Sequence, residues 1–288
     1  MCPTHGRVQE TIPWAEAYAR ITYRLEYILL VYCQMMTQKA AAELLHIAKS
    51  TLSDLLHRTI ERLREGHRIR GLRSVGVDEI SYCKGRKFAT IVYDLERHCV
   101  VWVGKGKGRE TIDLFFLREL SAKQRSAITS ASCDMSQAYI GAIKHHCPNA
   151  VLVLDHFHIT KALLATVDEV RKEEWRKADK SMKMTFKGLR WLLFLHSSNR
   201  TKRHTRLLNQ LKKGNRHIHR AWVLKDEFEQ FWQYVYPGAA ETFLKGWMTA
   251  ALKSRLQPLR EFVKTLKKHW EHVLAFINTP ITNAVGEG

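Results

Sequence analysis

The chain has 288 residues, a length that suggests two domains or three and allows a substantial buried core. It carries 47 Lys and Arg against 28 Asp and Glu, so its formal net charge is +19. Such a charge favours a polyanionic partner, of which nucleic acid is the commonest and a membrane surface the rival. No apolar run is long enough to span a bilayer, and the first residues lack the basic and apolar parts of a signal peptide. The six cysteines form no Cys-x-x-Cys pair, which favours a reducing cytoplasm over a disulfide scaffold.

The first 30 residues contain a pair with zinc-ligand spacing. Cys2 and His5 are spaced like half of a zinc ribbon, whereas a structural zinc needs four ligands. No second pair follows nearby, so an ordinary frayed terminus is the better description of these two residues taken alone. A helix with apolar spacing is predicted to follow Pro13 and Trp14.

Residues 37–58 have the pattern of a helix-turn-helix. A short helix is predicted over Gln38–Leu45, a turn over 46–49 and a second helix over Thr51–Arg62, with Ser50 as its N-cap. An ordinary helical hairpin is the alternative, but the apolar turn residue and the hydroxyl-rich second helix favour DNA binding. The inner face is predicted to consist of Ala41, Leu44, Leu52, Leu55 and Leu56. The residues predicted to contact DNA are Lys49, Ser50, Thr51, Ser53 and Arg58.

Three apolar strands between residues 72 and 155 are each predicted to end in an acid: Asp78, Asp134 and Asp155. With two further strands and two helices, the predicted order is βββαβαβ. This is the order of an RNase H-like mixed sheet, an antiparallel meander continued by parallel crossovers. Acids that converge at strand ends repel one another, and divalent cations relieve that repulsion and can clamp a phosphoryl displacement. Any one such acid more often only solvates a loop, and the two histidines after Asp155 are not expected to bind metal.

Helical periodicity continues for more than a hundred residues beyond position 160. From Arg176 to Arg220 there are 14 Lys and Arg and a single acid, Asp179. The usual explanation of a charge run is a solvated helix surface, but this imbalance favours contact with a phosphate backbone. The residues selected for that contact are Arg203, Arg206, Lys212 and Lys213.

Taken in order, the motifs resemble those of the DDE transposases of the ISL-three insertion-sequence family. They are Cys2-Pro3-x-His5-Gly6, Pro13-Trp14-Ala15, Val77-Asp78-Glu79, Cys133-Asp134-Met135-Ser136, Asp155-x-Phe157-His158, and Thr282-Asn283 followed by Glu287-Gly288. The resemblance covers essentially the whole chain, and the ordered set is far more specific than any single motif.

The resemblance implies a fold and a set of functional residues. Asp78, Asp134 and Glu287 correspond to the catalytic acids, which bind Mg²⁺ or Mn²⁺, whereas Asp155 is not expected in the triad. Zn²⁺ is implied for full-length relatives, where Cys2 and His5 are candidate ligands. The implied fold is an RNase H-like mixed sheet (α+β or α/β) preceded by a helix-turn-helix and interrupted by a large all-helical insertion. The implied regions are 1–30 (zinc-ribbon remnant and lead-in helix), 31–70 (helix-turn-helix), 71–160 (catalytic core), 161–278 (basic helical insertion) and 279–288 (start of the last catalytic helix).

The predicted function is that of a DNA transposase, in which water cuts a strand of an insertion sequence and the freed 3′-OH attacks target DNA. The expected partners are the double-stranded DNA of the element ends and target and, on that DNA, further copies of the same chain, with no membrane. The absent half of the zinc ribbon and the end of the chain just after Glu287 predict an internal piece of a longer transposase, or a decayed gene. Such a chain is expected to bind DNA without strand transfer. The alternatives are a non-catalytic DNA-binding regulator derived from a transposase, and a nuclease of the same fold.

Overall fold

The computed structural model describes residues 12–16, 21–64, 68–83, 85 and 87–283, except for the side chains at positions 63, 64, 181, 184, 185, 187 and 213. Cys2, His5 and Glu287 therefore lie outside the described residues. The chain forms two compact units, Met1–Arg68 and Ile69–Gly288. Within the described ranges, no helix is long and apolar enough to cross a membrane.

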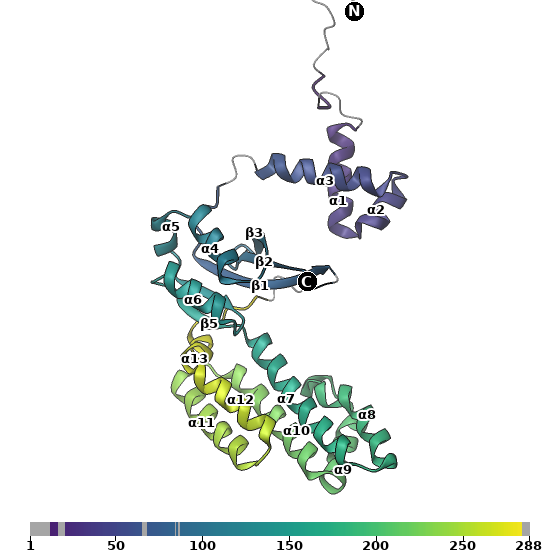
Figure 1. The fold of residues 1–288 in the computed structure, drawn as a ribbon, viewed down its shortest axis with the longest axis vertical. Helices are drawn as coiled ribbons and strands as arrows, with labels where there is room; N and C mark the ends of the chain where they lie inside the picture. The colour runs from purple at the N-terminus through teal and green to yellow at the C-terminus, as the bar shows by residue number, and fades with distance from the viewer. Residues whose placement is uncertain (1–11, 17–20, 65–67, 84, 86, 284–288) are drawn as a thin grey trace, which may run out of the picture. The chain divides into compact units, whose positions relative to one another are not determined.

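The amino-terminal unit contains the helices α1 (Tyr23–Met35), α2 (Gln38–Leu44) and α3 (Lys49–Arg64) (Figure 1). Threonine side chains cap the first two helices: Thr22 accepts a hydrogen bond from the backbone N–H of Leu25, and Thr37 from that of Ala40. The core of this unit is made of Leu29, Ala41, Ala42, Leu52 and Leu55. The predicted helix-turn-helix is therefore present.

Two details of the predicted hairpin are wrong. Ser50 is not the N-cap, because α3 already begins at Lys49. Leu44 was predicted on the inner face but is 53% exposed. Ala41 and Ala42 both face the core, so the buried face is centred between them, and Leu44 is turned about 110° away from that centre at 3.6 residues per turn.

The second unit is built on a five-stranded sheet with the strand order β3-β2-β1-β4-β5. Its strands are β1 (Ser74–Cys83), β2 (Lys87–Asp94), β3 (Cys99–Lys105), β4 (Ser130–Cys133) and β5 (Val151–Leu154). The first three strands form an antiparallel meander, whereas β4 pairs parallel with β1, and β5 parallel with β4. The mixed sheet predicted from the sequence is therefore confirmed.

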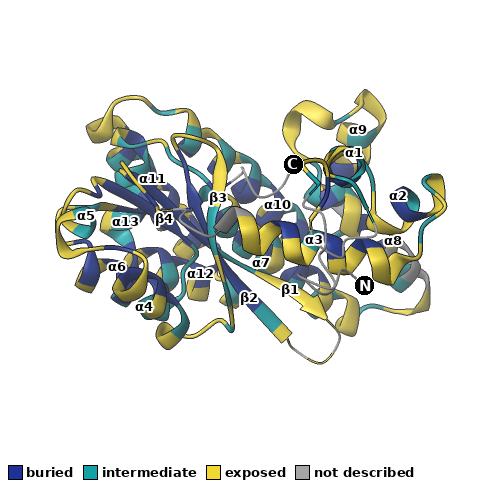
Figure 2. Ribbon diagram, turned by 90° about the horizontal axis from the view of Figure 1, so that it is seen from above, coloured by how far each residue is buried: buried dark blue, intermediate teal, exposed yellow. Residues whose placement is uncertain are grey.

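Helices α4 (Arg109–Arg118), α5 (Ala122–Ser126) and α6 (Gln137–His146) lie between the strands in sequence. The main core contains Ile112, Phe115 and Phe116 of α4, all fully buried, together with Val75 and Val77 of β1. Strand β1 is buried over its first four residues and exposed over its last four, as Figure 2 shows. The acids therefore stand on a rigid, well-packed part of the sheet.

A helical region follows β5 and accounts for the rest of the unit. Its helices are α7 (His156–Lys177), α8 (Lys180–Phe194), α9 (Lys202–Gly214), α10 (Arg216–Glu229), α11 (Pro237–Lys253), α12 (Gln257–Lys268) and α13 (Trp270–Asn278), with 3₁₀ turns at Ser197–Asn199 and Gln230–Gln233. Helix α7 packs against α8, α10 and α12, and α13 packs against β5 (Figure 1). The large helical insertion predicted from the periodicity is thus confirmed as a bundle continuous with the sheet core.

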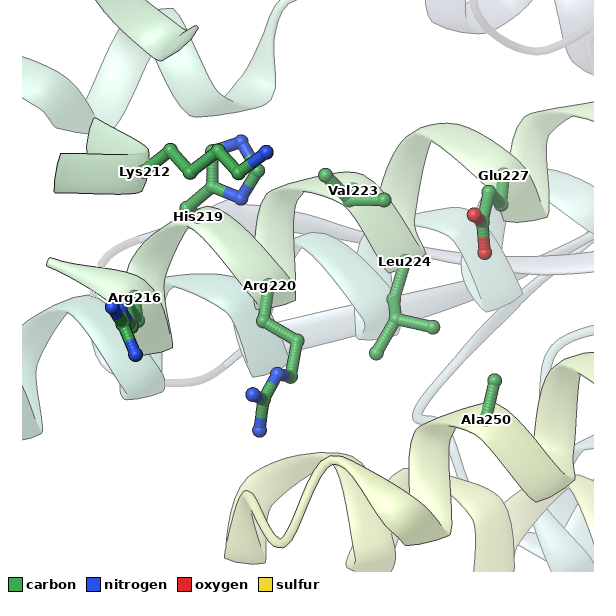
Figure 3. Close-up of a pocket in the computed structure, with 8 residues that line it drawn as sticks. All are labelled: Lys212, Arg216, His219, Arg220, Val223, Leu224, Glu227 and Ala250. Atoms are coloured by element: carbon green, nitrogen blue, oxygen red, sulfur yellow. The ribbon is translucent and has the colours of Figure 1, made fainter. Parts of the chain in front are cut away.

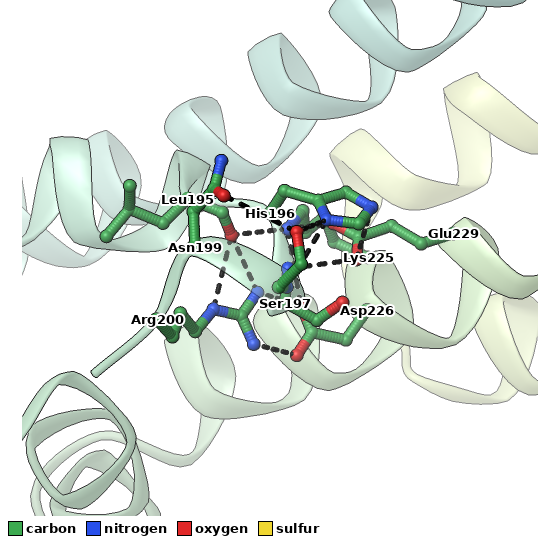
Figure 4. Close-up of polar contacts among 9 residues, drawn as sticks. Leu195, His196, Ser197, Asn199, Arg200, Lys225, Asp226 and Glu229 are labelled. Carbon is green, nitrogen blue, oxygen red and sulfur yellow. Dashed lines mark hydrogen bonds and ion pairs between the residues drawn. The ribbon is translucent and has the colours of Figure 1, made fainter. Parts of the chain in front are cut away.

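Some cations of this bundle are neutralised inside it (Figure 4). Lys225 is 2% exposed and forms ion pairs with Asp226 at 3.2 Å and Glu229 at 2.5 Å. Its Nζ also donates to the carbonyl of Leu195 at 3.0 Å, and Arg200 pairs with Asp226 and donates to the same carbonyl. Because these cations already have partners, they are not available to bind a polyanion.

Replacing Lys225 with alanine is expected to lower the free energy of unfolding by about 3 kcal/mol, because it leaves buried carboxylates without their cation. Lys264→Ala is the control: Lys264 pairs with Glu261 at 2.9 Å but is 70% exposed, so its loss should cost less than about 1 kcal/mol. Urea unfolding measures both. Equal destabilisation by the two variants would show that the buried network is no stronger than a surface ion pair.

Candidate functional site

Three carboxylates follow three neighbouring strands at the same level of the sheet. Val77 pairs with Cys133 across β1 and β4, and Cys133 pairs with Leu154 across β4 and β5. The next residue along each strand is an acid, namely Asp78, Asp134 and Asp155. Since neighbouring strands lie about 4.8 Å apart, these acids form a row with Asp134 in the middle.

The prediction that Asp78 ends its strand is wrong. Strand β1 continues to Cys83 and pairs with β2 throughout, with Asp78 opposite Ile91. What ends at this level is the parallel neighbour, because β4 stops at Cys133. Asp78 is therefore held by pairing on one side and exposed to the acid row on the other, which fixes it more firmly than a strand end would.

Asp155 differs from the other two acids because it is only 3% exposed. It is the N-cap of α7, and its Oδ1 accepts a hydrogen bond from the backbone N–H of Phe157 at 3.4 Å. The same oxygen accepts a bond from the hydroxyl of Thr282 at 3.0 Å. These contacts assign Asp155 a structural role at the start of a long helix.

His158 joins the acid row from the first turn of α7. Its Nε2 lies 3.6 Å from Oδ1 of Asp78 and 4.0 Å from Oδ2 of Asp155, which are ion-pair distances rather than hydrogen bonds. The Asp78 carboxylate raises the pKa of His158 above its usual value, against the opposing effect of burial. The prediction that the histidines face opposite sides of a strand end is wrong, since both lie on a helix.

The carboxylates of the row repel one another. Burial raises the pKa of Asp134 above its usual value, and the neighbouring charges of Asp78 and Asp155 raise it further. The backbone N–H of Ser136, which donates to Asp134 at 2.8 Å, and the nearby His158 act in the opposite direction. The site is therefore short of positive charge, as expected of carboxylates that bind a cation.

The donor set of the row fits a hard divalent cation. Asp78 and Asp134 offer carboxylate oxygens, the donors that Mg²⁺ and Mn²⁺ prefer. Within the described part of the chain, no three His, Cys, Asp or Glu side chains are grouped closely enough to hold a metal ion. A complete set of protein ligands therefore needs a donor beyond the described residues.

The chain returns to the acid row after the helical region. Thr282 reaches Asp155, and the side-chain Nδ2 of Asn283 donates to the carbonyl of Val77, the residue before Asp78, at 3.0 Å. Asn283 is 2% exposed, although 206 positions separate it from Val77 in sequence. The described part of the chain thus ends beside the acids, four residues before Glu287.

The residues predicted to contact DNA in the amino-terminal unit lie along the start and the outer face of α3. All five, Lys49, Ser50, Thr51, Ser53 and Arg58, are exposed. The apolar residues Leu52 and Leu55 between them are buried. The helix therefore presents polar side chains to solvent and apolar ones to the core.

A second basic surface lies on α9 and the start of α10. Arg203, Arg206, Lys212 and Arg216 are exposed, and none of them forms an ion pair with a described carboxylate. Helix α9 contains no acid at all. The side chain of Lys213, which was also predicted to contact DNA, is outside the described residues.

A cavity of about 710 Å³ adjoins this basic surface, between α10 and α11. Figure 3 shows the cationic side chains Lys212, Arg216 and Arg220 at one end of it and Glu227 at the other. Its apolar lining comes from residues such as Leu224. Positive charge is therefore gathered on the side that continues from α9.

Two residues beside the acids had no role predicted from the sequence. His158 and Asn283 both lie in the motifs that carry the family resemblance, but neither periodicity nor composition marks them. The spacing Asp155-x-x-His158 was one available signal, because a helix N-cap and the residue three positions later lie on the same side of the first turn. No local signal joins Asn283 to Val77.

Comparisons with known proteins agree with this geometry. The DDE transposase family ISL3, described as "Transposase", matches residues 75–288, and the helix-turn-helix domain of transposase family ISL3 matches residues 10–60. The chain is 28% identical to the transposase for insertion sequence element IS1001 of Bordetella parapertussis, over 97% of this chain and 69% of that protein. It is 25% identical to the transposase for insertion sequence element IS1557 of Mycobacterium tuberculosis, over 93% of this chain and 65% of that protein.

Proposed function

The chain belongs to the ISL3 family of DDE transposases, and from this premise we propose that it cuts and joins DNA strands at the ends of an insertion sequence. In this proposal the acids are Asp78, Asp134 and Glu287. The observation that carries it is the register of β1 and β4, which places Asp78 and Asp134 side by side on a buried sheet.

Family membership implies use of a divalent metal, and we propose Mg²⁺ or Mn²⁺ as the ion. When bound, the metal neutralises developing charge on the phosphate and activates the attacking oxygen. The two aspartates hold the ion, and the paired strand under Asp78 keeps its carboxylate from moving. His158, 3.6 Å from Asp78, orients that carboxylate from α7.

DNA binding follows from the helix-turn-helix and transposase domains. We propose that α3 enters the major groove with Lys49, Ser50, Thr51, Ser53 and Arg58. We propose further that Arg203, Arg206, Lys212 and Lys213 contact the phosphate backbone. The absence of described ion pairs for the first three leaves their charge free to displace counterions.

Removing three of these charges should reduce the salt dependence of DNA binding. For Arg203→Ala, Arg206→Ala and Lys212→Ala combined, the slope of log K against log salt is expected to fall by about 2 to 3, at about 0.9 per lost phosphate contact. The control removes three cations that already have acidic partners, Lys172, Lys177 and Lys264. Titrations of a labelled duplex at several salt concentrations give both slopes. Equal slopes for the two triple variants would place the DNA elsewhere.

A strand-transfer assay tests the proposed function as a whole. A duplex that ends in the element's terminal sequence is incubated with the protein, Mg²⁺ and a target plasmid. Joining of the 3′ end to the plasmid supports a transposase. Metal-dependent cutting without joining would indicate a nuclease, and DNA binding without either would indicate a regulator derived from a transposase.

We propose also that the protein works in the cytoplasm and that at least two copies assemble on the DNA, since an element has two ends. The five described cysteines are all free, as expected in a reducing compartment. Sedimentation of the protein with and without paired element ends measures the assembly.

A further inference from the structure

Three contacts attach the segment after α13 to the acid end of the sheet. Thr282 donates its hydroxyl hydrogen bond to Asp155 at 3.0 Å, and Asn283 donates to the carbonyl of Val77 at 3.0 Å. Ile281 packs against the apolar group on β2 and the turn after it. We call Thr282, Asn283 and their two partners, Asp155 and Val77, the clasp.

The strand below the clasp is shaped to accept it. A Cβ added at Gly76 would lie 2.6 Å from Oδ1 of Asn283 and 2.7 Å from Cδ2 of Leu95, closer than such atoms approach in proteins. Gly76 is therefore present for space, because its side chain position is filled by the asparagine. Val77 pairs with Cys133, the last residue of β4, so the amide of Asn283 meets β1 where its parallel neighbour ends.

The clasp is not optimised for stability alone. Oδ1 of Asn283 is buried and has no hydrogen-bond partner among the residues that the structure describes. An unpaired buried acceptor is unfavourable, and such groups are retained where they serve another purpose. Val77 directly precedes Asp78, and Asn283 precedes Glu287 by four residues.

We infer that the clasp is a positioning device that delivers the segment carrying Glu287 to Asp78 and Asp134. This inference rests on the proposed function. More than a hundred residues of helical bundle separate β5 from this segment, so without an anchor a carboxylate beyond it samples a large volume. Four residues span at most about 14 Å, so anchoring Asn283 beside Asp78 confines Glu287 to the neighbourhood of the acid row.

A double-mutant cycle on Mn²⁺ affinity tests the inference. Asn283→Ala is expected to weaken Mn²⁺ binding by about tenfold or more, the size of effect seen when an outer-shell partner is lost. Glu287→Gln should weaken it at least as much, and Asn283→Ala should add nothing once Glu287→Gln is present. A residue that only stabilised the fold would have the same effect in both backgrounds. Asn278→Ala, at the exposed end of α13, is the matched control and should bind Mn²⁺ normally.

Thr282→Val gives a second, milder test, because it keeps the volume and removes the hydroxyl that bonds Asp155. It should weaken Mn²⁺ binding while the melting curve still shows a folded protein, and it decides the case if Asn283→Ala does not fold. Normal Mn²⁺ affinity in the clasp variants, or an Asn283→Ala effect that persists undiminished beside Glu287→Gln, would overturn the inference. If instead Asp78→Asn and Asp134→Asn leave Mn²⁺ binding unchanged, the proposed function fails, and the clasp with it.

Discussion

Asp134→Asn is expected to slow metal-dependent strand cleavage by about a thousandfold, because the middle acid of the row is lost and metal stabilisation of several kcal/mol with it. The fold should not suffer. Burial and the charges of Asp78 and Asp155 raise the pKa of Asp134, so its ionised form is unfavourable in the folded protein. Asparagine keeps the oxygen that accepts from Ser136 and removes the charge, so the melting temperature without metal should rise.

Cleavage rates and melting curves, measured for the same preparations, check both parts of this expectation. Glu119→Gln is the control, since it also converts a carboxylate to an amide but lies exposed just after α4. It should change neither quantity. Cleavage by Asp134→Asn at the normal rate would remove Asp134 from the active site.

The second large effect is expected at Glu287, and its comparison with Asp155 identifies the third acid. Glu287→Gln should slow cleavage by about a thousandfold, as for the other acids. Asp155→Asn should slow it less than about tenfold, because asparagine caps a helix as well as aspartate does and can still accept from Thr282. Each change replaces a carboxylate with the amide of the same size, so the two variants differ only in where the charge is removed.

The opposite ranking would reverse the assignment. If Asp155→Asn abolishes cleavage and Glu287→Gln does not, the three strand acids form the triad by themselves. That result would also remove the purpose that we assign to the clasp. Single-turnover cleavage of a labelled element end separates these outcomes, because it measures the chemical step rather than product release.

Much of the sheet could be predicted because its signals are local. Apolar strands such as Val151–Leu154 and the helical spacing of Ile112, Phe115 and Phe116 are read within a few residues. The extent of β1 beyond Asp78 could not be read in this way. Residues 80–83 are exposed and form a strand because β2 pairs with them, which is a tertiary effect on a weak local preference.

The site was only partly predictable for the same reason. Asp78 and Asp134 are marked by the apolar strands that precede them, so their convergence followed from the order of the elements. The role of Asp155 depends on whether a helix or a loop follows it, and the start of α7 at His156 decides this. The contact of Asn283 with Val77 joins parts of the chain 206 residues apart, and no periodicity records such a contact.

Metal-directed cleavage of the protein backbone tests the central claim most directly. The purified chain is loaded with Fe²⁺ in place of Mg²⁺, and ascorbate and peroxide then generate radicals that cut the polypeptide beside the bound ion. We predict fragments that end near Asp78 and Asp134, suppressed by excess Mg²⁺ and absent from the Asp78→Asn, Asp134→Asn double variant. Fragments that map elsewhere, or that persist in the double variant, would contradict a metal centre at this edge of the sheet.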